Sequence, residues 1–226
     1  MRPIPHPLGQ LELDDQQLRL EGVPYQAVRE LGRGKSAISW LYQRQADHPS
    51  LPRELVLKRY CQTGYETVPF DQILDFELCS YLRLMESGIP HPHLLAYSQA
   101  HYALAKEYIA GELIVEIQQR EGLDDRHFGA MLQMAGRLQA AGYHVDFFPT
   151  NFVLNERGLH YIDYEAHPYS EEWNFANWGI FYWLNREGMA AYLSSGEVGH
   201  INKPGEPKPL EAPFLRQRES ILRRLS

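Results

Sequence analysis

The sequence predicts an α+β protein: a small, mostly antiparallel sheet with one helix in the first half and a mostly helical second half. Strand-like patterns of apolar residues dominate residues 25–109. One segment inside this region, residues 70–87, changes to helical period. Helical patterns return in residues 124–193, and a run of strands followed by a run of helices is typical of the α+β class.

The first half begins with four leucines at alternating positions that predict a short hairpin, namely Leu11, Leu13, Leu18 and Leu20. Longer strands are expected at residues 28–31, 38–42, 54–60, 94–97 and 102–109. The helical segment 70–87 lies between Pro69 and Gly88, and both residue types commonly flank helices. The first half therefore reads as a sheet with one helix inserted.

The second half begins with a helix for which Asp124 and Asp125 are candidate N-caps and Gly142 is a candidate C-cap. Residues 152–154 and 159–162 then predict a hairpin. Three segments complete the chain: a buried, aromatic-rich helix at 173–193, an irregular proline- and glycine-containing region at 196–213, and a basic helix at 214–225.

The composition is that of a globular protein, and it limits the possible partners. A net charge of -7 argues against nonspecific binding to nucleic acid, which requires basic surface. No apolar run approaches the roughly 18 residues of a membrane helix, and the proline-rich start lacks the apolar segment of a signal peptide. We therefore expect a cytoplasmic protein without membrane contact, in which Cys61 and Cys79 are free thiols. The oligomeric state stays open.

A polar loop and a later acidic residue carry the strongest chemical signal. Asp146 is followed five residues later by Asn151, and Asp163 comes directly after a short strand-like run. In magnesium-dependent phosphoryl transfer, one Asp orients the hydroxyl nucleophile, while an Asn and a second Asp hold the metal that neutralises the phosphates. The alternative for each residue alone is a polar loop or a capped turn.

The residues His144, Asp146, Pro149, Asn151 and Asp163, in this order and spacing, resemble the protein-kinase-like superfamily. The resemblance implies that Asp146 is catalytic, that Asn151 and Asp163 bind Mg²⁺, and that His144 supports the loop. The nearest group comprises small bacterial kinase-like proteins regarded as Ser/Thr kinases, with aminoglycoside- and choline-kinase-like enzymes as relatives.

The resemblance extends over roughly residues 25–185 and implies a bilobal protein-kinase-like fold. The N-lobe would comprise residues 1–108, with the sheet and its helix. The C-lobe would comprise residues 109–226, which is reduced and mostly helical. ATP and Mg²⁺ would bind in a cleft, and the γ-phosphate would move to a hydroxyl group of a protein or small-molecule acceptor.

A glycine-containing segment of the first half resembles the loop that covers the nucleotide phosphates. Its residues are Gly32, Gly34, Lys35, Ser36 and Ala37. Glycine permits close approach of the backbone, whose N–H groups then face the anion. The segment is not a Walker A motif, because that motif requires glycine where this chain has Arg29.

Lys58 ends the run Leu-Val-Leu-Lys, which resembles the family strand whose lysine reaches the nucleotide phosphates. Glu77 is its expected partner, because it shares the apolar face of the helix at 70–87 and an acid there requires a cation. Both residues are therefore assigned to catalysis, and Lys58 also to nucleotide binding. A solvated Lys and Glu are the alternative.

The segment 106–113 resembles the hinge between the lobes, where Glu107 and Ile109 would offer backbone groups to the adenine edge. The alternative is a buried strand followed by a turn. Side-chain identity does not separate the two.

Four departures from the family pattern bear on activity. Val145 replaces a common Arg, Phe148 replaces a basic residue, Glu165 replaces the Gly of Asp-Phe-Gly, and Ala37 replaces the third loop glycine. Only 63 residues follow Asp163, which favours a small-molecule acceptor over a folded protein. Three functions therefore stay open: a Ser/Thr protein kinase, a small-molecule kinase and a pseudokinase that binds nucleotide or a partner. The basic tail at 214–226 either docks a partner or packs on its own lobe.

Overall fold

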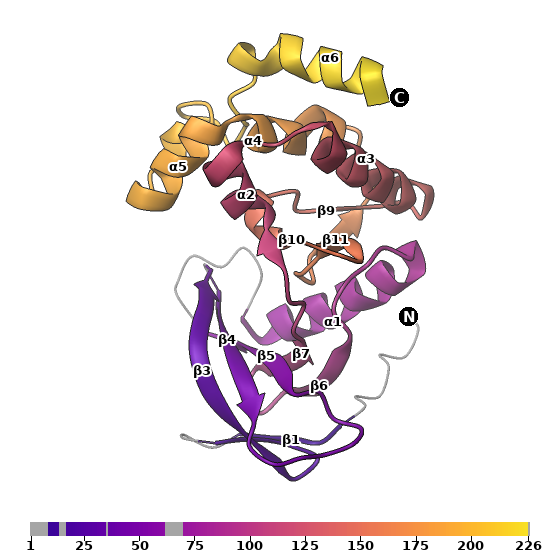
Figure 1. The fold of residues 1–226 in the computed structure, drawn as a ribbon, viewed down its shortest axis with the longest axis vertical. Coiled ribbons are helices and arrows are strands. Elements are labelled where there is room, and N and C mark those ends of the chain that lie inside the picture. The colour runs from indigo at the N-terminus through magenta and orange to yellow at the C-terminus, as the bar shows by residue number, and fades with distance from the viewer. Residues whose placement is uncertain (1–8, 14–16, 35, 62–69, 226) are drawn as a thin grey trace. The chain divides into compact units, whose positions relative to one another are not determined.

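The computed structural model describes residues 9–13, 17–34, 36–61 and 70–225. The chain divides into two compact units, whose elements are labelled in Figure 1. Unit 1 comprises Met1–Leu82 and Pro92–Ile109, and unit 2 comprises Arg83–His91 and Ala110–Ser226. The segment Arg83–His91 groups with unit 2 rather than with the sheet that precedes it, because it hydrogen-bonds there: the backbone N–H of Tyr161, for example, donates to the Pro90 carbonyl at 3.0 Å.

Unit 1 contains a seven-stranded antiparallel sheet in the order β1-β2-β3-β4-β5-β7-β6. Its strands are β1 (Leu11–Leu13), β2 (Leu18–Leu20), β3 (Val23–Arg33), β4 (Ala37–Arg44), β5 (Glu54–Tyr60), β6 (Leu94–Ser98) and β7 (Ala103–Glu107). The hairpin predicted from alternating leucines is present as β1 and β2. The predicted antiparallel sheet is confirmed.

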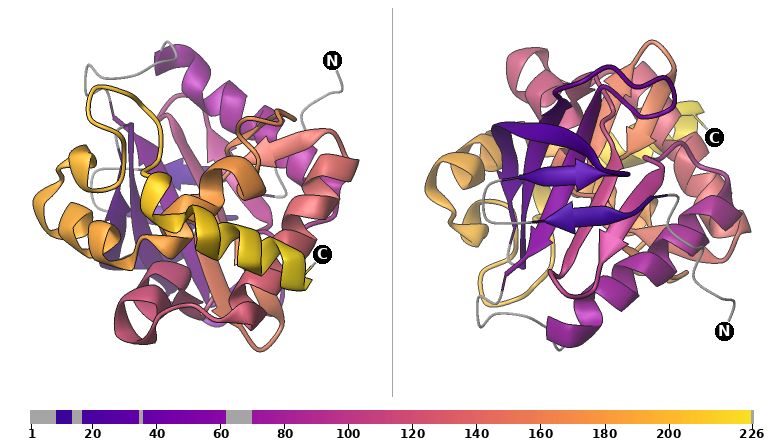
Figure 2. Two further views of the ribbon diagram at one scale, coloured as in Figure 1. Left: turned by 90° about the horizontal axis from the view of Figure 1, so that it is seen from above. Right: turned by 90° about the horizontal axis from the view of Figure 1, so that it is seen from below.

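The sheet of unit 1 curls, so that the edge strands β1 and β6 contact each other; Figure 2 shows these strands from below in its right view. One face of the curled sheet encloses an apolar core of Leu18, Leu20, Tyr25, Leu55, Leu57, Ala96, Ala103 and Ala105. The N-terminal hairpin supplies two of these leucines. The first strands therefore close a core rather than form a loose tail.

Helix α1 (Phe70–Ser87) has the predicted bounds. Leu74, Leu78 and Leu84 are fully buried and recur at the helical spacing that the sequence predicts. Glu77 is buried as well, so an acidic side chain lies among these apolar positions. In the part of the chain that the structure describes, no helix is long and apolar enough to cross a membrane.

Among its described residues, unit 2 contains five further α-helices, four shorter helical turns and two small sheets. The sheets have the orders β11-β10-β8 and β12-β9. The strands are β8 (Glu112–Leu113), β9 (Tyr143–Val145), β10 (Phe152–Asn155), β11 (Gly158–Tyr161) and β12 (Ala166–Pro168). The helices are α2 (Ile114–Glu121), α3 (Asp125–Ala140), α4 (Ile180–Leu184), α5 (Arg186–Ser195) and α6 (Leu215–Leu225), with a π-helical turn η2 (Phe175–Gly179).

Helix α3 begins where its capping chemistry predicts. The Asp124 side chain accepts hydrogen bonds from the backbone N–H groups of Arg126 and His127, which makes Asp124 the N-cap. At the other end Gly142 has a φ of 83°, the left-handed conformation that favours glycine after a helix. The chain then turns directly into β9 and the polar loop.

The prediction of a single aromatic helix at 173–193 is wrong. The chain instead forms the turn η2, then α4, then α5, with a break at Asn185. The break has a local cause, because the Asn185 side chain accepts a hydrogen bond from the Gly188 N–H and thereby caps a new helix. Most of the aromatic residues are buried, but Trp173 is 41% exposed.

Helix α6 lies against α3 and α4 of its own unit, as the left view of Figure 2 shows. Arg224 forms an ion pair of 2.6 Å with Asp125 at the start of α3. The Arg218 guanidinium donates to the Ala176 carbonyl and to the Asn177 side chain. These contacts favour the reading in which the basic tail packs on its own lobe.

Candidate functional site

Asp146 lies in the loop between β9 and β10, which the 3₁₀ turn η1 (Pro149–Asn151) closes. Its two carboxylate oxygens have different partners. The backbone N–H of Phe148 donates to one oxygen at 3.2 Å, and the amide of Asn151 donates to the other at 3.0 Å. The loop therefore fixes the orientation of the carboxylate, although the Asp146 side chain remains exposed.

Both backbone polar groups of Asn151 are hydrogen-bonded. Its backbone N–H donates to the Phe148 carbonyl at 2.9 Å, and its carbonyl accepts from the N–H of Ile162 at 2.9 Å. Since the side-chain nitrogen donates to Asp146, the side-chain oxygen Oδ1 points to the opposite side of the amide. This oxygen receives only a long contact of 3.5 Å from the Thr150 hydroxyl. It is therefore the atom of Asn151 that suits a hard cation.

The loop rests on the aromatic core of unit 2. The indole N–H of Trp183 donates to the Phe147 carbonyl at 2.9 Å, and both side chains are buried. Gly179 packs beneath the same residue, because a Cβ built there would lie 2.3 Å from the Cβ of Phe147. A side chain at position 179 would thus push against the catalytic-loop candidate.

Two neighbouring carboxylates raise the negative charge around Asp146. Burial, then the charges of Glu165 and Asp163, raise the pKa of Asp146 to about 7, while the hydrogen bonds from Phe148 and Asn151 oppose this rise. The Asp146 side chain is nonetheless exposed. Surrounding protein atoms therefore crowd the carboxylate and remove part of its hydration, but they do not enclose it.

Glu165 adds a further carboxylate, and its charge is one cause of the raised pKa of Asp146. Its carboxylate contacts Nε2 of His167 at 3.0 Å, and the Tyr161 hydroxyl donates to its carbonyl at 3.0 Å. His167 stacks on His144, with ring centroids 5.5 Å apart, because β12 pairs with β9 in register at these residues. Burial, and then His167, lower the pKa of His144.

The ring on which His144 stacks, His167, belongs to β12 and not to the loop that carries Asp146. The Nδ1 atom of His144 is buried and has no hydrogen-bond partner among the described residues. Nδ1 of His144 therefore makes no hydrogen bond to the described part of the loop that carries Asp146, and the supporting role of His144 stays a prediction.

The residues of unit 2 fit a magnesium ion by chemistry. Asn151 Oδ1 and the Asp163 carboxylate are hard oxygen ligands, and Mg²⁺ commonly takes one or two carboxylates with water and phosphate. The excess negative charge near Asp146 would be relieved by a cation. Among the described residues, no group of three or more His, Cys, Asp or Glu side chains is arranged to hold a metal. The two-residue ligand set therefore stays a prediction.

Phe148 follows Asp146 by two residues in the same loop. Its ring packs edge-on against Tyr182, with centroids 5.2 Å apart, and against Tyr192 at 5.7 Å. Burial, and then the charge of Asp146, raise the pKa of Tyr182 to about 12, so this phenol stays neutral beside the carboxylate. Aromatic groups therefore lie near Asp146.

In unit 1, Lys58 and Glu77 form the pair that the sequence predicts. The Lys58 Nζ atom lies 2.6 Å from Glu77 Oε1, and the two side chains are only 12% and 10% exposed. Lys58 also lies over the Tyr60 ring, 5.7 Å from its centroid. The alternative of a solvated lysine and a solvated glutamate does not hold.

The predicted phosphate loop connects β3 and β4. The Gly34 N–H donates to the Ala37 carbonyl at 2.9 Å, and the Ser36 carbonyl accepts from Cys61. A Cβ at Gly32 would meet nothing within 4 Å among the described residues, and one at Gly34 would meet only the Ala37 oxygen at 3.8 Å. Internal packing therefore gives no reason for glycine here, whereas close approach of a ligand would. Lys35 lies outside the described residues.

The predicted hinge backbone follows β7. The N–H of Glu107 donates to the His93 carbonyl at 2.9 Å, so only the carbonyl of Glu107 could contact a base. The N–H of Ile109 has no hydrogen-bond partner among the described residues, and the residue is half-buried. The segment could therefore offer a base one acceptor, the Glu107 carbonyl, and one donor, the Ile109 N–H.

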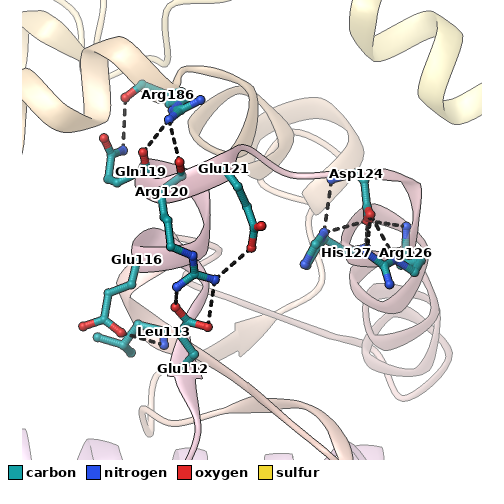
Figure 3. Close-up of polar contacts among 10 residues, drawn as sticks. All are labelled: Glu112, Leu113, Glu116, Gln119, Arg120, Glu121, Asp124, Arg126, His127 and Arg186. Carbon is teal, nitrogen blue, oxygen red and sulfur yellow. Dashed lines mark hydrogen bonds and ion pairs between the residues drawn. The ribbon is translucent and has the colours of Figure 1, made fainter.

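A pocket of about 480 Å³ lies at the junction of α2 and α3, and none of the predicted site residues lines it. Its charged groups pair with one another, Arg120 with Glu112 and Arg126 with Asp124, as Figure 3 shows. His127 accepts a hydrogen bond from the Asp124 N–H at 3.1 Å. Because these charges are already paired, the functional candidate stays the cluster around Asp146.

No relative assists the assignment. A comparison with models of known protein families finds no match, and a comparison with curated proteins finds none either.

Proposed function

We propose that this chain is an ATP-dependent phosphotransferase that moves the γ-phosphate to a hydroxyl acceptor, in the manner of a Ser/Thr protein kinase. The observation that carries the proposal is the Asp146 carboxylate, fixed by Asn151 and placed within charge range of Asp163. Positioning and charge neutralisation account for most catalysis of phosphoryl transfer.

Each residue has a defined task in this proposal. Asp146 accepts a hydrogen bond from the acceptor hydroxyl and orients it, and a pKa near neutrality suits a group that also takes up the proton. Asn151 and Asp163 would hold Mg²⁺, which when bound neutralises phosphate charge. Lys58, kept in place by Glu77, contacts the phosphates, and the loop from Gly32 to Ala37 covers them.

A small-molecule hydroxyl compound is the second candidate for the acceptor. Phe148, which packs on Tyr182, offers an apolar surface beside Asp146 instead of a positive charge. The segment between Asp163 and Phe175 is short and already paired through β12, which leaves little chain to dock a polypeptide. Both features favour a compact acceptor.

The test uses the purified full chain. ATP consumption is measured with and without magnesium, in the presence of hydroxylated metabolites and of Ser/Thr peptides. Asp163→Ala should keep the fold but lose phosphoryl transfer by orders of magnitude, because one metal-binding carboxylate is removed. Asp125→Ala is the matched control: it removes an aspartate of the same unit whose partner is the surface residue Arg224.

Three results decide between the functions. Loss of turnover in Asp163→Ala but not in Asp125→Ala supports the phosphotransferase. Equal turnover in the wild type and Asp163→Ala rejects the site. Magnesium-dependent ATP binding without turnover of any acceptor would instead support the pseudokinase, a nucleotide-binding module.

A further inference from the structure

Lys106 is a buried lysine that none of the roles above uses. It lies on β7 and is only 5% exposed. In the sheet it faces Val56 of β5 on one side and Leu94 of β6 on the other. Lysine is rarely buried to this extent, since transfer of its ammonium group from water is costly. Its ammonium group therefore requires polar partners.

The side chains of Lys106 and Lys58 extend from the same face of the sheet. Val56 pairs with Lys106, and Lys58 follows Val56 by two residues, the period at which strand side chains return to one face. Lys58 pairs with Leu104, which makes the two lysines diagonal neighbours with Cβ atoms roughly 7 Å apart or less. The opposite face of these strands carries the apolar core residues Leu57 and Ala105.

This face therefore carries two ammonium groups, one of which holds Glu77 at 2.6 Å. An ammonium group has three N–H donors and no acceptor, so it can keep a protein partner and still donate to a ligand. Lys106 directly precedes Glu107 and Ile109, the segment expected to contact a nucleotide base. A base against that segment would meet a charged donor, then the Glu107 carbonyl, then the backbone of Ile109.

We infer that Lys106 determines base specificity and that the nucleotide site prefers a 6-oxopurine, guanine or hypoxanthine, over adenine; this inference rests on the proposed phosphotransferase function. The 6-oxygen of guanine is an acceptor, whereas adenine carries an amino donor at that position. A 6-oxopurine would accept from Lys106 through O6 and donate from N1–H to the Glu107 carbonyl.

Adenine makes a different set of contacts. Its amino group would donate to the Glu107 carbonyl and its N1 would accept from the Ile109 N–H, which has no partner among the described residues. It offers no acceptor at the 6-position to Lys106. Each base therefore makes two hydrogen bonds, but the 6-oxopurine makes a charged one where adenine makes a neutral one, and this exchange is worth about tenfold in affinity.

The experiment compares ATP with ITP, which differ only in the purine ring, where the 6-amino group and N1 of adenine become the 6-oxygen and N1–H of hypoxanthine. Dissociation constants for ATP, ITP and GTP are measured by calorimetry with magnesium on the full chain. The wild type should bind ITP about tenfold more tightly than ATP. Lys106→Met should remove this difference. Arg59→Met is the matched control, because Arg59 is an exposed cation on the opposite face of β5, and it should keep the preference.

The outcomes separate the inference from the function beneath it. Magnesium-dependent ATP binding that equals or exceeds ITP binding in the wild type overturns the inference and leaves the phosphotransferase intact. A preference for ITP that persists in Lys106→Met also overturns it, because another group then reads the base. Failure of all three nucleotides to bind overturns both. The wild-type comparison is decisive even where the methionine variant does not fold.

Discussion

The side-chain amide of Asn151 donates a hydrogen bond of 3.0 Å to the carboxylate of Asp146, five residues earlier in the same loop. One amide therefore does two things: its nitrogen orients the carboxylate, and its oxygen remains as a potential metal ligand. The backbone of Asn151 is itself held by Phe148 and Ile162. The spacing of five residues between Asp146 and Asn151 therefore allows the two side chains to hydrogen-bond within one loop.

Asn151→Ala should abolish magnesium-dependent ATP binding while lowering the free energy of unfolding by only about 1 kcal/mol, the usual net worth of one hydrogen bond. The ligand oxygen and the anchor of Asp146 are lost together. Calorimetry and urea unfolding measure the two effects. Asn155→Ala serves as control, since Asn155 donates to the Ala110 carbonyl at 2.9 Å away from the carboxylates; ATP affinity lost equally in both variants would contradict the assignment.

Lys58→Met should lower the free energy of unfolding by about 3 kcal/mol, because it leaves the buried Glu77 carboxylate without its cation. The double variant Lys58→Met, Glu77→Leu should recover part of this loss, since apolar residues replace a buried ion pair at little cost. Urea unfolding of the single and double variants completes the cycle. A single variant that loses less than about 1 kcal/mol would show that the pair behaves as a surface salt bridge.

Asp146→Asn should gain stability relative to the wild type as the pH rises from 4 to 8. The folded pKa of about 7 lies above the usual value near 4, so the protonated carboxyl group is favoured by folding at low pH. That contribution is complete below pH 4 and is lost as the pH rises through 7. Because the side chain is exposed, screening limits the effect to about 1 kcal/mol. A stability difference that stays constant across this range would rule out the raised pKa.

Gly179→Ala should destabilise unit 2 by about 1–3 kcal/mol, because its Cβ would overlap with Phe147 in a packed region. Activity should fall with it, since Phe147 neighbours Asp146. Gly129→Ala is the contrast: this residue lies inside α3, and a Cβ there meets nothing within 4 Å among the described residues. It should raise the melting temperature, because alanine favours the helix. Thermal unfolding of both variants checks the sign.

Local chemistry made much of the fold predictable. The bounds of α1 and the N-cap of α3 follow from apolar period and from a side chain that bonds to its own neighbouring backbone. The strands β8 and β12 could not be predicted in this way. They contain two or three residues and exist only because β10 and β9 lie beside them. The break at Asn185 was missed because aromatic residues at helical spacing concealed a capping residue.

The candidate site divides in the same manner. Asp146, Asn151 and Asp163 could be found from their spacing, because a loop and a strand end fix short-range geometry. The sequence did not predict the contributions of three further residues near Asp146, namely Glu165, Tyr182 and Gly179. Glu165 acts on Asp146 only through the pairing of β12 with β9, and the other two approach the loop from helical segments far along the chain.

By itself the sequence determined most strands of the large sheet, the bounds of α1 and the start of α3, and it indicated Asp146, Asn151 and Asp163 as candidate site residues, because these depend on neighbours within a few positions. Only the tertiary structure decided that an aromatic group lies beside Asp146 and that Lys106 is buried on the face of Lys58. These facts depend on strand register and on packing between distant segments, and charge and burial act through space rather than along the chain.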